Sequence, residues 1–436
     1  MSWQEDYKKK LVTPEEAVSH IKSGDRVGVP GGPGMPFDLM VALGNRYEEL
    51  KDVNIYSGIT MYMLDMFKPE YRGHINFYTL FMGPLERIFL KQKGNVNVVS
   101  YHMSSTSVIM DHYDVNVAMI EVSAPDERGF MSLGLFGVTN GLYAMQRSDL
   151  VIAQVNKHMP YVTGLEAVVH VNDIDFFTEN DHPIASLPEI PVTPEDEKIG
   201  AFIADLVPDG ATVQLGIGGT SNIVGALLKD KKDLGIHTEM MVDSMMTLYD
   251  AGAVTNMKKT FHKGKMLTGF CIGSQELYKF VDRNSIVEFA PVMYTNDPIN
   301  IAKNDNFMSI NNTITADLTG QCASESIGHQ MYSGTGGQLN FIRGAAMSKG
   351  GKSFLALPSS GTTKEGKRYS RIVTNFLPGT VVTTPRSDVH YIVTEFGAVD
   401  MRLESIPARV KKMISIAHPD FRDQLAHEAK EAGLVI

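Results

Sequence analysis

The sequence has very few cysteines, only Cys271 and Cys322 in 436 residues. Two thiols in a chain of this length do not make a disulfide framework, and neither belongs to a CxxC pair or a histidine cluster of the kind that binds zinc. The scarcity argues against a disulfide-stapled secreted domain and against a cysteine-ligated metal. We therefore expect a metal-free protein.

Excess positive charge and long apolar runs are also missing. Lysine and arginine number 40 against 50 aspartate and glutamate, which gives a formal net charge of -10 and argues against a nucleic-acid-binding surface. No apolar run reaches the roughly 18 residues of a membrane helix. Residues 1–6 are polar and acidic, unlike a signal peptide. We expect a cytoplasmic protein that binds neither nucleic acid nor membrane.

The sequence does contain a pattern that occurs twice. Thr13-Pro14 and Thr193-Pro194 each supply an N-cap threonine and a proline at the first helical position, followed by acidic residues. Each predicted helix leads to a short strand and then to a glycine-rich loop, at 30–36 and 216–219. An internal duplication follows. A proline-rich stretch at 183–194 predicts a linker, so we expect domains at 1–188 and 189–436.

Short apolar runs alternate with helical stretches along both halves. The predicted strands include 53–56, 115–120, 150–153, 353–357 and 391–394. Continuous apolar strands between helices indicate α/β domains with largely parallel sheets. Ligands of such sheets bind beyond the carboxyl ends of the strands, which is where the 216–219 loop is expected.

Glu239 follows the glycines of this loop by about twenty residues, as a single acid in an apolar, methionine-rich setting. One interpretation is a dinucleotide-binding turn whose ribose is held by the acid. Another is that backbone N–H groups of the loop approach a thioester while the acid acts as nucleophile. The spacing departs from GxGxxG because Ser221 takes the place of the last glycine. A tight turn without a ligand is the simplest third interpretation.

Two further segments carry candidate chemistry. A second glycine cluster at 332–341, followed by Lys349, could bind an anion through backbone N–H groups or form a mobile surface loop. Asn311 and Asn312 stand next to apolar residues, where amides are costly to bury unless paired. One of them could donate to a carbonyl oxygen that becomes negative, or both could form a turn.

Taken together, these segments resemble the family I coenzyme A transferases, in the branch that also holds acetyl-CoA hydrolases and the 4-hydroxybutyrate and butyrate CoA-transferases. The resemblance covers nearly the whole chain. Its motifs lie at 124–134, 155–160, 214–219, 235–239, 294–298, 309–311, 332–338, 349–352 and 394–397.

The resemblance implies two similar α/β domains with the active site at their interface, and a homodimer or a dimer of dimers. It implies an enzyme that transfers CoA from an acyl-CoA to a free carboxylic acid, acetate or another short-chain acid being one partner. The implied mechanism is ping-pong, through a glutamyl-CoA thioester on Glu239. CoA and acyl-CoA are then substrates, and no tightly bound cofactor is expected.

The resemblance also assigns roles to individual residues. Glu239 matches the nucleophile, and Glu395 matches a second glutamate that positions it. The side-chain amide of Asn311 and the backbone N–H of Gly337 match the groups that bind the developing oxyanion. The residues expected to bind CoA are Gly216, Ile217, Gly218, Gly219, Thr220, Ser333, Gly336, Gly337 and Lys349.

The sequence leaves several alternatives open. An acyl-CoA hydrolase could use the same residues, an NAD-dependent dehydrogenase could use the 216–219 loop, and a non-catalytic CoA-binding protein would need neither chemistry. The acyl substrate is not fixed, because Thr220-Ser221 departs from the family's pattern. The 30–36 loop could shape an acyl pocket or belong to ordinary core, as could four residues nearby in sequence, namely Met61, Tyr62, Met63 and Met82. We interpret His237 as structural, because transfer between carboxylates needs no base.

Overall fold

The computed structural model describes residues 2–188, 190–216 and 218–435. Its contacts divide the chain into two compact units. The first comprises Met1–Pro188 with Glu239–Met241 and Leu267–Thr295, and the second comprises the remainder. The predicted boundary after residue 188 stays a prediction, because the first unit also takes up two later segments. The mixed α/β class with largely parallel sheets is confirmed.

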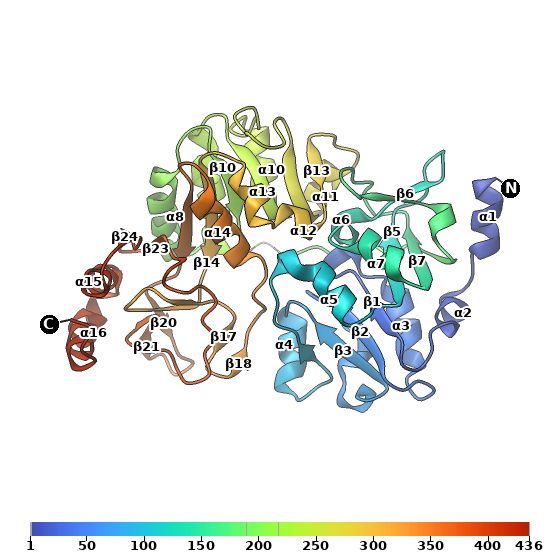
Figure 1. Cartoon of the computed structure of the whole chain (residues 1–436), viewed down its shortest axis with the longest axis horizontal. Helices are drawn as coiled ribbons and strands as arrows, with labels where there is room; N and C mark the ends of the chain where they lie inside the picture. Colours follow the sequence, from blue (N-terminus) through green and yellow to red (C-terminus); the bar gives the residue numbers. More distant parts are fainter. Residues whose placement is uncertain (1, 189, 217, 436) are drawn as a thin grey trace. The chain divides into compact units, whose positions relative to one another are not determined.

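The first unit is built on a seven-stranded sheet in the order β4-β3-β2-β1-β5-β7-β9 (Figure 1). Every neighbouring pair in it runs parallel. Its strands are β1 (Arg26–Gly28), β2 (Val53–Ser57), β3 (Ile75–Thr79), β4 (Asn97–Val98), β5 (Val117–Val122), β7 (Leu150–Asn156) and β9 (Phe176–Asn180). A separate antiparallel pair joins β6 (Phe130–Ser132) and β8 (Val168–His170).

Helices connect these strands and close a core of buried aliphatic and aromatic side chains. The α-helices of this part of the chain are α1 (Trp3–Lys10), α2 (Pro14–Ser19), α3 (Phe37–Asn45), α4 (Pro84–Lys91), α5 (Thr106–His112), α6 (Gly134–Gly137) and α7 (Gly141–Arg147). The later segment of the first unit adds α11 (Gln275–Val281) and α12 (Val292–Thr295).

The second sheet has eight strands in the order β13-β12-β11-β10-β14-β19-β23-β24. The pairs β10–β11, β10–β14, β14–β19 and β19–β23 are parallel, and β24 pairs antiparallel with β23. Its strands are β10 (Thr212–Leu215), β11 (Gly235–Met241), β12 (Met266–Cys271), β13 (Val287–Phe289), β14 (Phe307–Asn312), β19 (Lys352–Ala356), β23 (Tyr391–Thr394) and β24 (Gly397–Asp400).

In the second unit, α8 packs on α9, and α14 packs on α13, β14 and β19. Its helices are α8 (Pro194–Leu206), α9 (Gly219–Leu227), α10 (Asp243–Asp250), α13 (Pro298–Ala302), α14 (Gln338–Met347), α15 (Ile406–Ile416) and α16 (Pro419–Glu431). Short strands form small additional sheets, namely β15 (Thr315–Asp317), β16 (Cys322–Ala323), β17 (Ser326–Ile327), β18 (Gln330–Met331), β20 (Ser360–Thr362), β21 (Arg368–Ser370) and β22 (Ile372–Val373).

The two large sheets repeat one topology. If the strands of each sheet are numbered along the chain, both follow the order 4-3-2-1-5-6-7, and the second adds an eighth strand at its edge. The two predicted helix starts are also equivalent, since Thr13 caps α2 and Thr193 caps α8, each with proline at the first helical position. The expectation of two similar α/β halves is therefore confirmed.

Three observations concern the absences expected from the sequence. Cys271 and Cys322 are both buried, and the structure shows no disulfide bond between them. Among the residues that the structure describes, no cluster of histidine, cysteine and acidic side chains could hold a metal ion. In the same residues, no helix combines the length and the hydropathy that a bilayer crossing requires.

Candidate active site

The first glycine loop leaves β10 and passes the end of β14. The N–H of Gly216 donates to the carbonyl of Ile310 over 2.9 Å. Gly218 has a φ of 124°, and a Cβ there would lie 3.0 Å from the amide nitrogen of Asn312. Glycine at 218 thus serves both the backbone conformation and the close approach. Ile217, also predicted to bind CoA, lies outside the described residues.

Thr220, another predicted CoA contact, is buried in the first turn of α9 and faces α8. Its hydroxyl donates to Oδ1 of Asp196 over 2.5 Å, while the hydroxyl of Thr193 donates to Oδ2 over 2.7 Å. A Cβ on Gly219 would lie 2.6 Å from the same Oδ2. The hydroxyl of Thr220 therefore ties the start of α9 to α8.

Asn311 lies at the carboxyl end of β14, with its amide fixed by two buried side chains. Its Nδ2 donates to Oε1 of Gln214 over 3.1 Å and to Oγ of Ser309 over 3.0 Å. In return, Nε2 of Gln214 donates to Oδ1 of Asn311 over 3.1 Å, and Ser309 donates to Oε1 of Gln214 over 2.8 Å. The amide is thereby held in one orientation at the half-buried end of the strand.

The second glycine cluster is tied to buried Glu325 and leads into α14. The backbone N–H groups of Tyr332 and Ser333 donate to the carbonyl of Glu325 over 2.7 and 3.2 Å. Gly336 has a φ of 57°, and Gly337 is the N-cap of α14. The side chain of Gln338 donates to the carbonyl of Asn312 over 3.4 Å, which sets the start of α14 beside the end of β14.

Glu395 occupies the two-residue loop between β23 and β24, at the carboxyl end of β23. Its Oε2 accepts the backbone N–H of Ser359 over 2.8 Å, and its Oε1 accepts the hydroxyl of Ser359 over 2.6 Å. Ser359 is buried and follows β19. Since β10, β14, β19 and β23 run parallel, Gly216, Asn311 and Glu395 lie at the same edge of the sheet.

Lys349 lies at the opposite edge. It is exposed in the turn between α14 and β19, and its carbonyl accepts the N–H of Asn306 just before β14 begins. The structure therefore does not bring Lys349 together with the glycine loops and Asn311. Its predicted contact with CoA gains no support from this placement.

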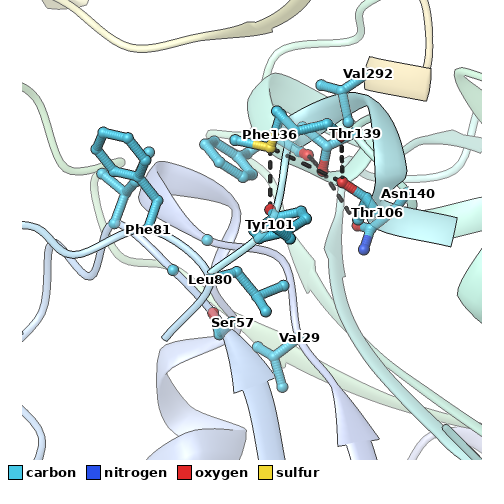
Figure 2. A pocket seen from close by; sticks show the side chains of 14 residues that line it. Val29, Ser57, Leu80, Phe81, Tyr101, Thr106, Phe136, Thr139, Asn140 and Val292 are labelled. Carbon is cyan, nitrogen blue, oxygen red and sulfur yellow. Dashed lines mark hydrogen bonds between the residues drawn. The ribbon is translucent and has the colours of Figure 1, made fainter. Parts of the chain in front are cut away.

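Glu239 is the fifth residue of β11 and clusters with the first unit. Gly269 packs against the backbone of Glu239. A Cβ added to Gly269 would lie 2.9 Å from the carbonyl oxygen of Glu239 and 2.8 Å from Cγ1 of Val292. The Glu239 carboxylate also acts on Tyr101, since its charge adds to the burial that raises the pKa of this phenol. Val292 and Tyr101 both line a small cavity in the first unit (Figure 2).

This cavity only partly matches the suggestion made from the sequence. Gly31, from the 30–36 loop, does line it. The four residues suggested nearby are not among its lining residues, namely Met61, Tyr62, Met63 and Met82. Tyr62 instead packs on Phe37, with ring centroids 5.1 Å apart, while Met82 is buried and Met63 is largely exposed.

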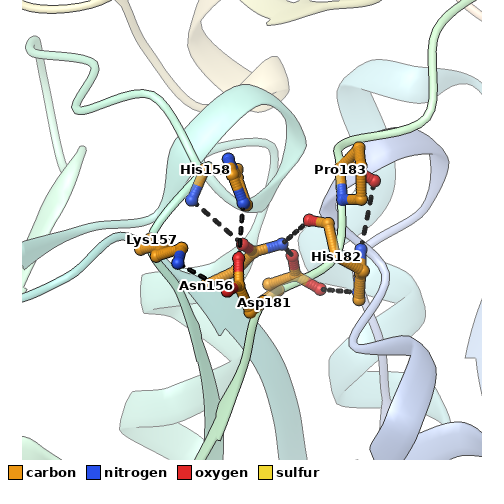
Figure 3. Close-up of polar contacts among 7 residues, drawn as sticks. Asn156, Lys157, His158, Asp181, His182 and Pro183 are labelled. Atoms are coloured by element: carbon orange, nitrogen blue, oxygen red, sulfur yellow. Dashed lines mark hydrogen bonds and ion pairs between the residues drawn. The ribbon is translucent and has the colours of Figure 1, made fainter.

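The 155–160 motif contributes Asn156 to a buried polar cluster at the carboxyl ends of β5 and β7 (Figure 3). Asn156 and Gln154 donate to the two oxygens of Glu121 over 2.8 and 2.9 Å. Burial raises the pKa of Glu121 to about 8 against the opposing effect of these amides. Beside it, Asp181 accepts hydrogen bonds from Lys157 and His158 over 2.5 and 2.6 Å.

Sequence reasoning missed the residues that orient the candidate site. Gln214 and Ser309 stand in otherwise apolar strands, and a polar side chain in a buried strand is a usable sign of a partner. Ser359 gave no such sign, because serine is common in turns. His237 has the structural environment expected for it, because it is fully buried among aromatic rings and is hydrogen-bonded to Asn304 over 3.0 Å.

Comparison with known proteins finds matches in both halves of the chain. Residues 1–188 match the acetyl-CoA hydrolase/transferase N-terminal domain, and residues 273–429 match the C-terminal domain of that name. A 4-hydroxybutyrate coenzyme A transferase from Clostridium kluyveri is 41% identical over 99% of this chain and 100% of its own. A succinyl-CoA:cyclohexane-1-carboxylate CoA transferase from Geobacter metallireducens is 41% identical over 100% and 98%. The crystal structure of RipA from Yersinia pestis superposes with a TM-score of 0.93, at 37% identity and full coverage of both chains.

Proposed function

We propose, because this chain belongs to the acetyl-CoA hydrolase/transferase family, that it is a CoA-transferase that moves coenzyme A from an acyl-CoA to a free carboxylic acid. Relatives named as CoA-transferases are 34–41% identical to it and span 95–100% of its length. Family membership over the whole chain is the observation that carries this function, and it favours thioester chemistry over the dinucleotide alternative.

The first half-reaction uses Glu239 as nucleophile. A carboxylate oxygen of Glu239 forms a C–O bond to the thioester carbonyl, and the C–S bond breaks to release the CoA thiolate. The thiolate then forms a C–S bond to the side-chain carbonyl carbon of Glu239 in the mixed anhydride. The C–O bond of the anhydride breaks, the product acid leaves as its carboxylate, and CoA stays on the enzyme as a glutamyl thioester.

The second half-reaction reverses these steps with the acceptor acid. Its carboxylate attacks the glutamyl thioester, and the thiolate released then attacks the acceptor side of the new anhydride. Bonds formed and broken match at each step, and no proton has to move. This agrees with our interpretation of His237 as structural.

Oxyanion stabilisation falls to Asn311 and to the N–H of Gly337. The tetrahedral intermediates place negative charge on the former carbonyl oxygen, and oriented donors lower their energy most when they need not reorganise. Nδ2 of Asn311 donates to Gln214 and to Ser309, which holds the amide in one orientation, and one of these two hydrogen bonds gives way when Asn311 donates to the oxyanion. Glu395, held by Ser359, would position the nucleophile from the same edge of the sheet as Asn311.

CoA is proposed to contact the backbone of Gly216, Gly218 and Gly219 and the second cluster at Ser333, Gly336 and Gly337. Glycines allow close backbone approach, and their N–H groups can bind phosphate or carbonyl oxygens. The enzyme is proposed to need no tightly bound cofactor and to assemble as a homodimer, which sedimentation analysis would test.

One trapping experiment tests the mechanism. The protein is mixed with acetyl-CoA alone and treated with borohydride, which reduces a thioester to an alcohol, and its peptides are weighed. We expect reduction at Glu239 in the wild type, none in Glu239→Gln, and wild-type reduction in Glu276→Gln, which alters an exposed glutamate of α11. Transfer activity without any trapped residue would contradict the glutamyl thioester.

The family's name also covers hydrolases, so water must be tested as acceptor. In the same experiment, free thiol is followed with and without added carboxylic acid. A transferase keeps CoA on Glu239 or passes it to the acceptor acid, so we expect no accumulation of free thiol with or without added acid. Continuous release without acid would identify a hydrolase.

A further inference from the structure

We propose that Gln154 is a positioning residue for CoA transfer, because it caps α3 from β7 and thereby holds the 30–36 loop against the strands around Glu239. This inference rests on the proposed CoA-transferase function and adds a residue that acts without touching the substrate. Gln154, α3, the loop and Glu239 all belong to the first unit.

The helix α3 takes its N-terminal cap from a distant part of the chain. Its own N-cap residue is Pro36, which offers no side-chain hydrogen bond to the first turn. The N–H groups of Asp38 and Leu39, the second and third residues of α3, donate instead to Oε1 of Gln154 over 3.0 and 3.2 Å. These are the two groups that a serine or aspartate at the N-cap normally satisfies. The fully buried Gln154, 115 residues away from Leu39 in sequence, therefore takes the place of the missing cap.

Glu121 determines which end of the Gln154 amide faces α3. Nε2 of Gln154 donates to Oε2 of Glu121 over 2.9 Å, which leaves Oε1 for the helix. A reversed amide would direct its N–H donors at the N–H donors of α3 and leave these groups unsatisfied in a buried place. Both ends of the amide are thus committed, so the side chain cannot turn without losing its contacts to Glu121 and to α3.

The cap bears on the reaction because α3 continues directly from the 30–36 loop. Pro36 is both the last residue of this loop and the N-cap of α3. The loop packs tightly on Phe136 of α6. A Cβ would lie 3.3, 2.8 and 3.0 Å from the Phe136 side chain at three glycines of the loop, namely Gly31, Gly32 and Gly34. A shift of the loop at its α3 end would therefore displace the ring of Phe136.

Phe136 connects the loop to the strands around the proposed nucleophile. Its ring packs on Phe270 of β12, with the ring centroids 4.5 Å apart. β12 is the neighbour of β11 in the second sheet, and the hydroxyl of Thr268 in β12 donates to the carbonyl of Glu239 over 3.4 Å. Loss of the cap on α3 would thus disturb the backbone at Glu239 without any change in a group that contacts CoA.

The test compares two replacements of Gln154, with acetyl-CoA as donor and the fastest acceptor from a panel of carboxylic acids. Gln154→Leu removes the acceptor and should lower kcat about tenfold, while KM for acetyl-CoA stays within about twofold of wild type. Gln154→Glu keeps an oxygen toward α3, where a carboxylate is favourable at a helix start, so its kcat should stay within about threefold of wild type. A role in packing alone predicts the opposite order, because a new buried charge is costlier than a buried leucine.

A local cap should rescue the loss. Pro36→Ser supplies an N-cap hydroxyl for the same two N–H groups. Pro36→Ser combined with Gln154→Leu should therefore return kcat to within about threefold of Pro36→Ser alone. Thr178→Val is the matched control and should keep wild-type kcat. Thr178 is buried beside Gln154 in register, and its hydroxyl has no hydrogen bond among the described residues.

The outcomes separate this inference from the proposed function. Wild-type kcat in Gln154→Leu, or a loss that Pro36→Ser does not restore, would overturn the positioning role and leave CoA transfer intact. If Gln154→Leu alone does not fold, the double variant decides by the same criterion. Absence of transfer by the wild type to every acid in the panel would instead refute the proposed function.

Discussion

Gln214 and Asn311 hold each other by two reciprocal hydrogen bonds of 3.1 Å between side-chain amides that are 97 residues apart in sequence. Gln214 is buried in β10, whereas Asn311 is half-buried at the end of β14. The buried amide of Gln214 thus fixes the orientation of the half-buried amide of Asn311. If Asn311 is the oxyanion donor, Gln214 is its positioning residue.

We therefore expect graded losses from these two positions. Asn311→Ala should lower kcat by about 10²- to 10³-fold, the usual effect of removing one oxyanion donor. Gln214→Leu should lower kcat by about 10- to 100-fold because Asn311 loses its orientation. Steady-state kinetics with saturating acyl-CoA measures both, and KM for acyl-CoA should change little. Wild-type kcat in Asn311→Ala would remove Asn311 from the mechanism.

The pairing of Glu395 with Ser359 predicts coupled effects. Glu395→Gln removes the charge from two hydrogen bonds and should destabilise the fold by about 1–3 kcal/mol, with a fall in kcat if the hairpin positions the nucleophile. Ser359→Ala keeps its backbone N–H and should have the smaller effect. The double variant should resemble Glu395→Gln alone, because both changes remove one shared interaction. Urea unfolding and kcat, measured on all three variants, check this, and fully additive effects would argue against it.

The position of Lys349 in the sheet allows its implied contact with CoA to be tested. Because it lies at the edge of the sheet opposite Gly216 and Asn311, Lys349→Ala should leave KM for acyl-CoA within about twofold of wild type, as expected for a surface substitution. Lys258→Ala, at another exposed lysine, is the matched control. A tenfold rise in KM confined to Lys349→Ala would show that CoA reaches this edge.

Glu121 should make stability depend on pH. Its ordinary pKa is 4.5, and burial raises it to about 8 in the folded protein. Between these values the folded chain keeps a proton that the unfolded chain has released, so stability falls as pH rises. The side chain in Glu121→Gln cannot ionise. Its free energy of unfolding, relative to that of wild type, should therefore rise by a few kcal/mol between pH 5 and pH 8. Urea unfolding at both pH values measures this gain, with exposed Glu127→Gln as control; parallel curves for Glu121→Gln and wild type would refute it.

The sequence predicted the parts of the fold that local chemistry determines. The Thr13 and Thr193 caps were visible because threonine, proline and acids form one continuous signal. The strand predicted at 391–394 coincides with β23 (Tyr391–Thr394), and the one predicted at 353–357 lies one residue from β19 (Lys352–Ala356). The α/β class and the family followed from such signals in a fixed order.

What the sequence could not predict depends on strand register and topology. The pairing of Gln214 with Asn311 requires β10 and β14 to be neighbours in the sheet, although β11, β12 and β13 lie between them in sequence. The resemblance implies a CoA contact for Lys349, whereas the position of Lys349 beside the start of β14 follows only from the pairing of β14 with β19. The hydrogen bond from the Thr220 hydroxyl to Asp196 was also not visible in the sequence, because the two residues become neighbours only on folding.

The shared strand order of the two sheets gives two polar residues equivalent positions. Glu121 and Asn311 are each the fifth residue of a six-residue strand that takes the fifth place in its sheet, β5 in one half and β14 in the other. Two separate identical copies would have to carry the same residue at both places. Within one chain the two positions can differ: the one in β5 carries a buried carboxyl group that accepts from two amides, and the one in β14 carries an amide at the half-buried end of the strand.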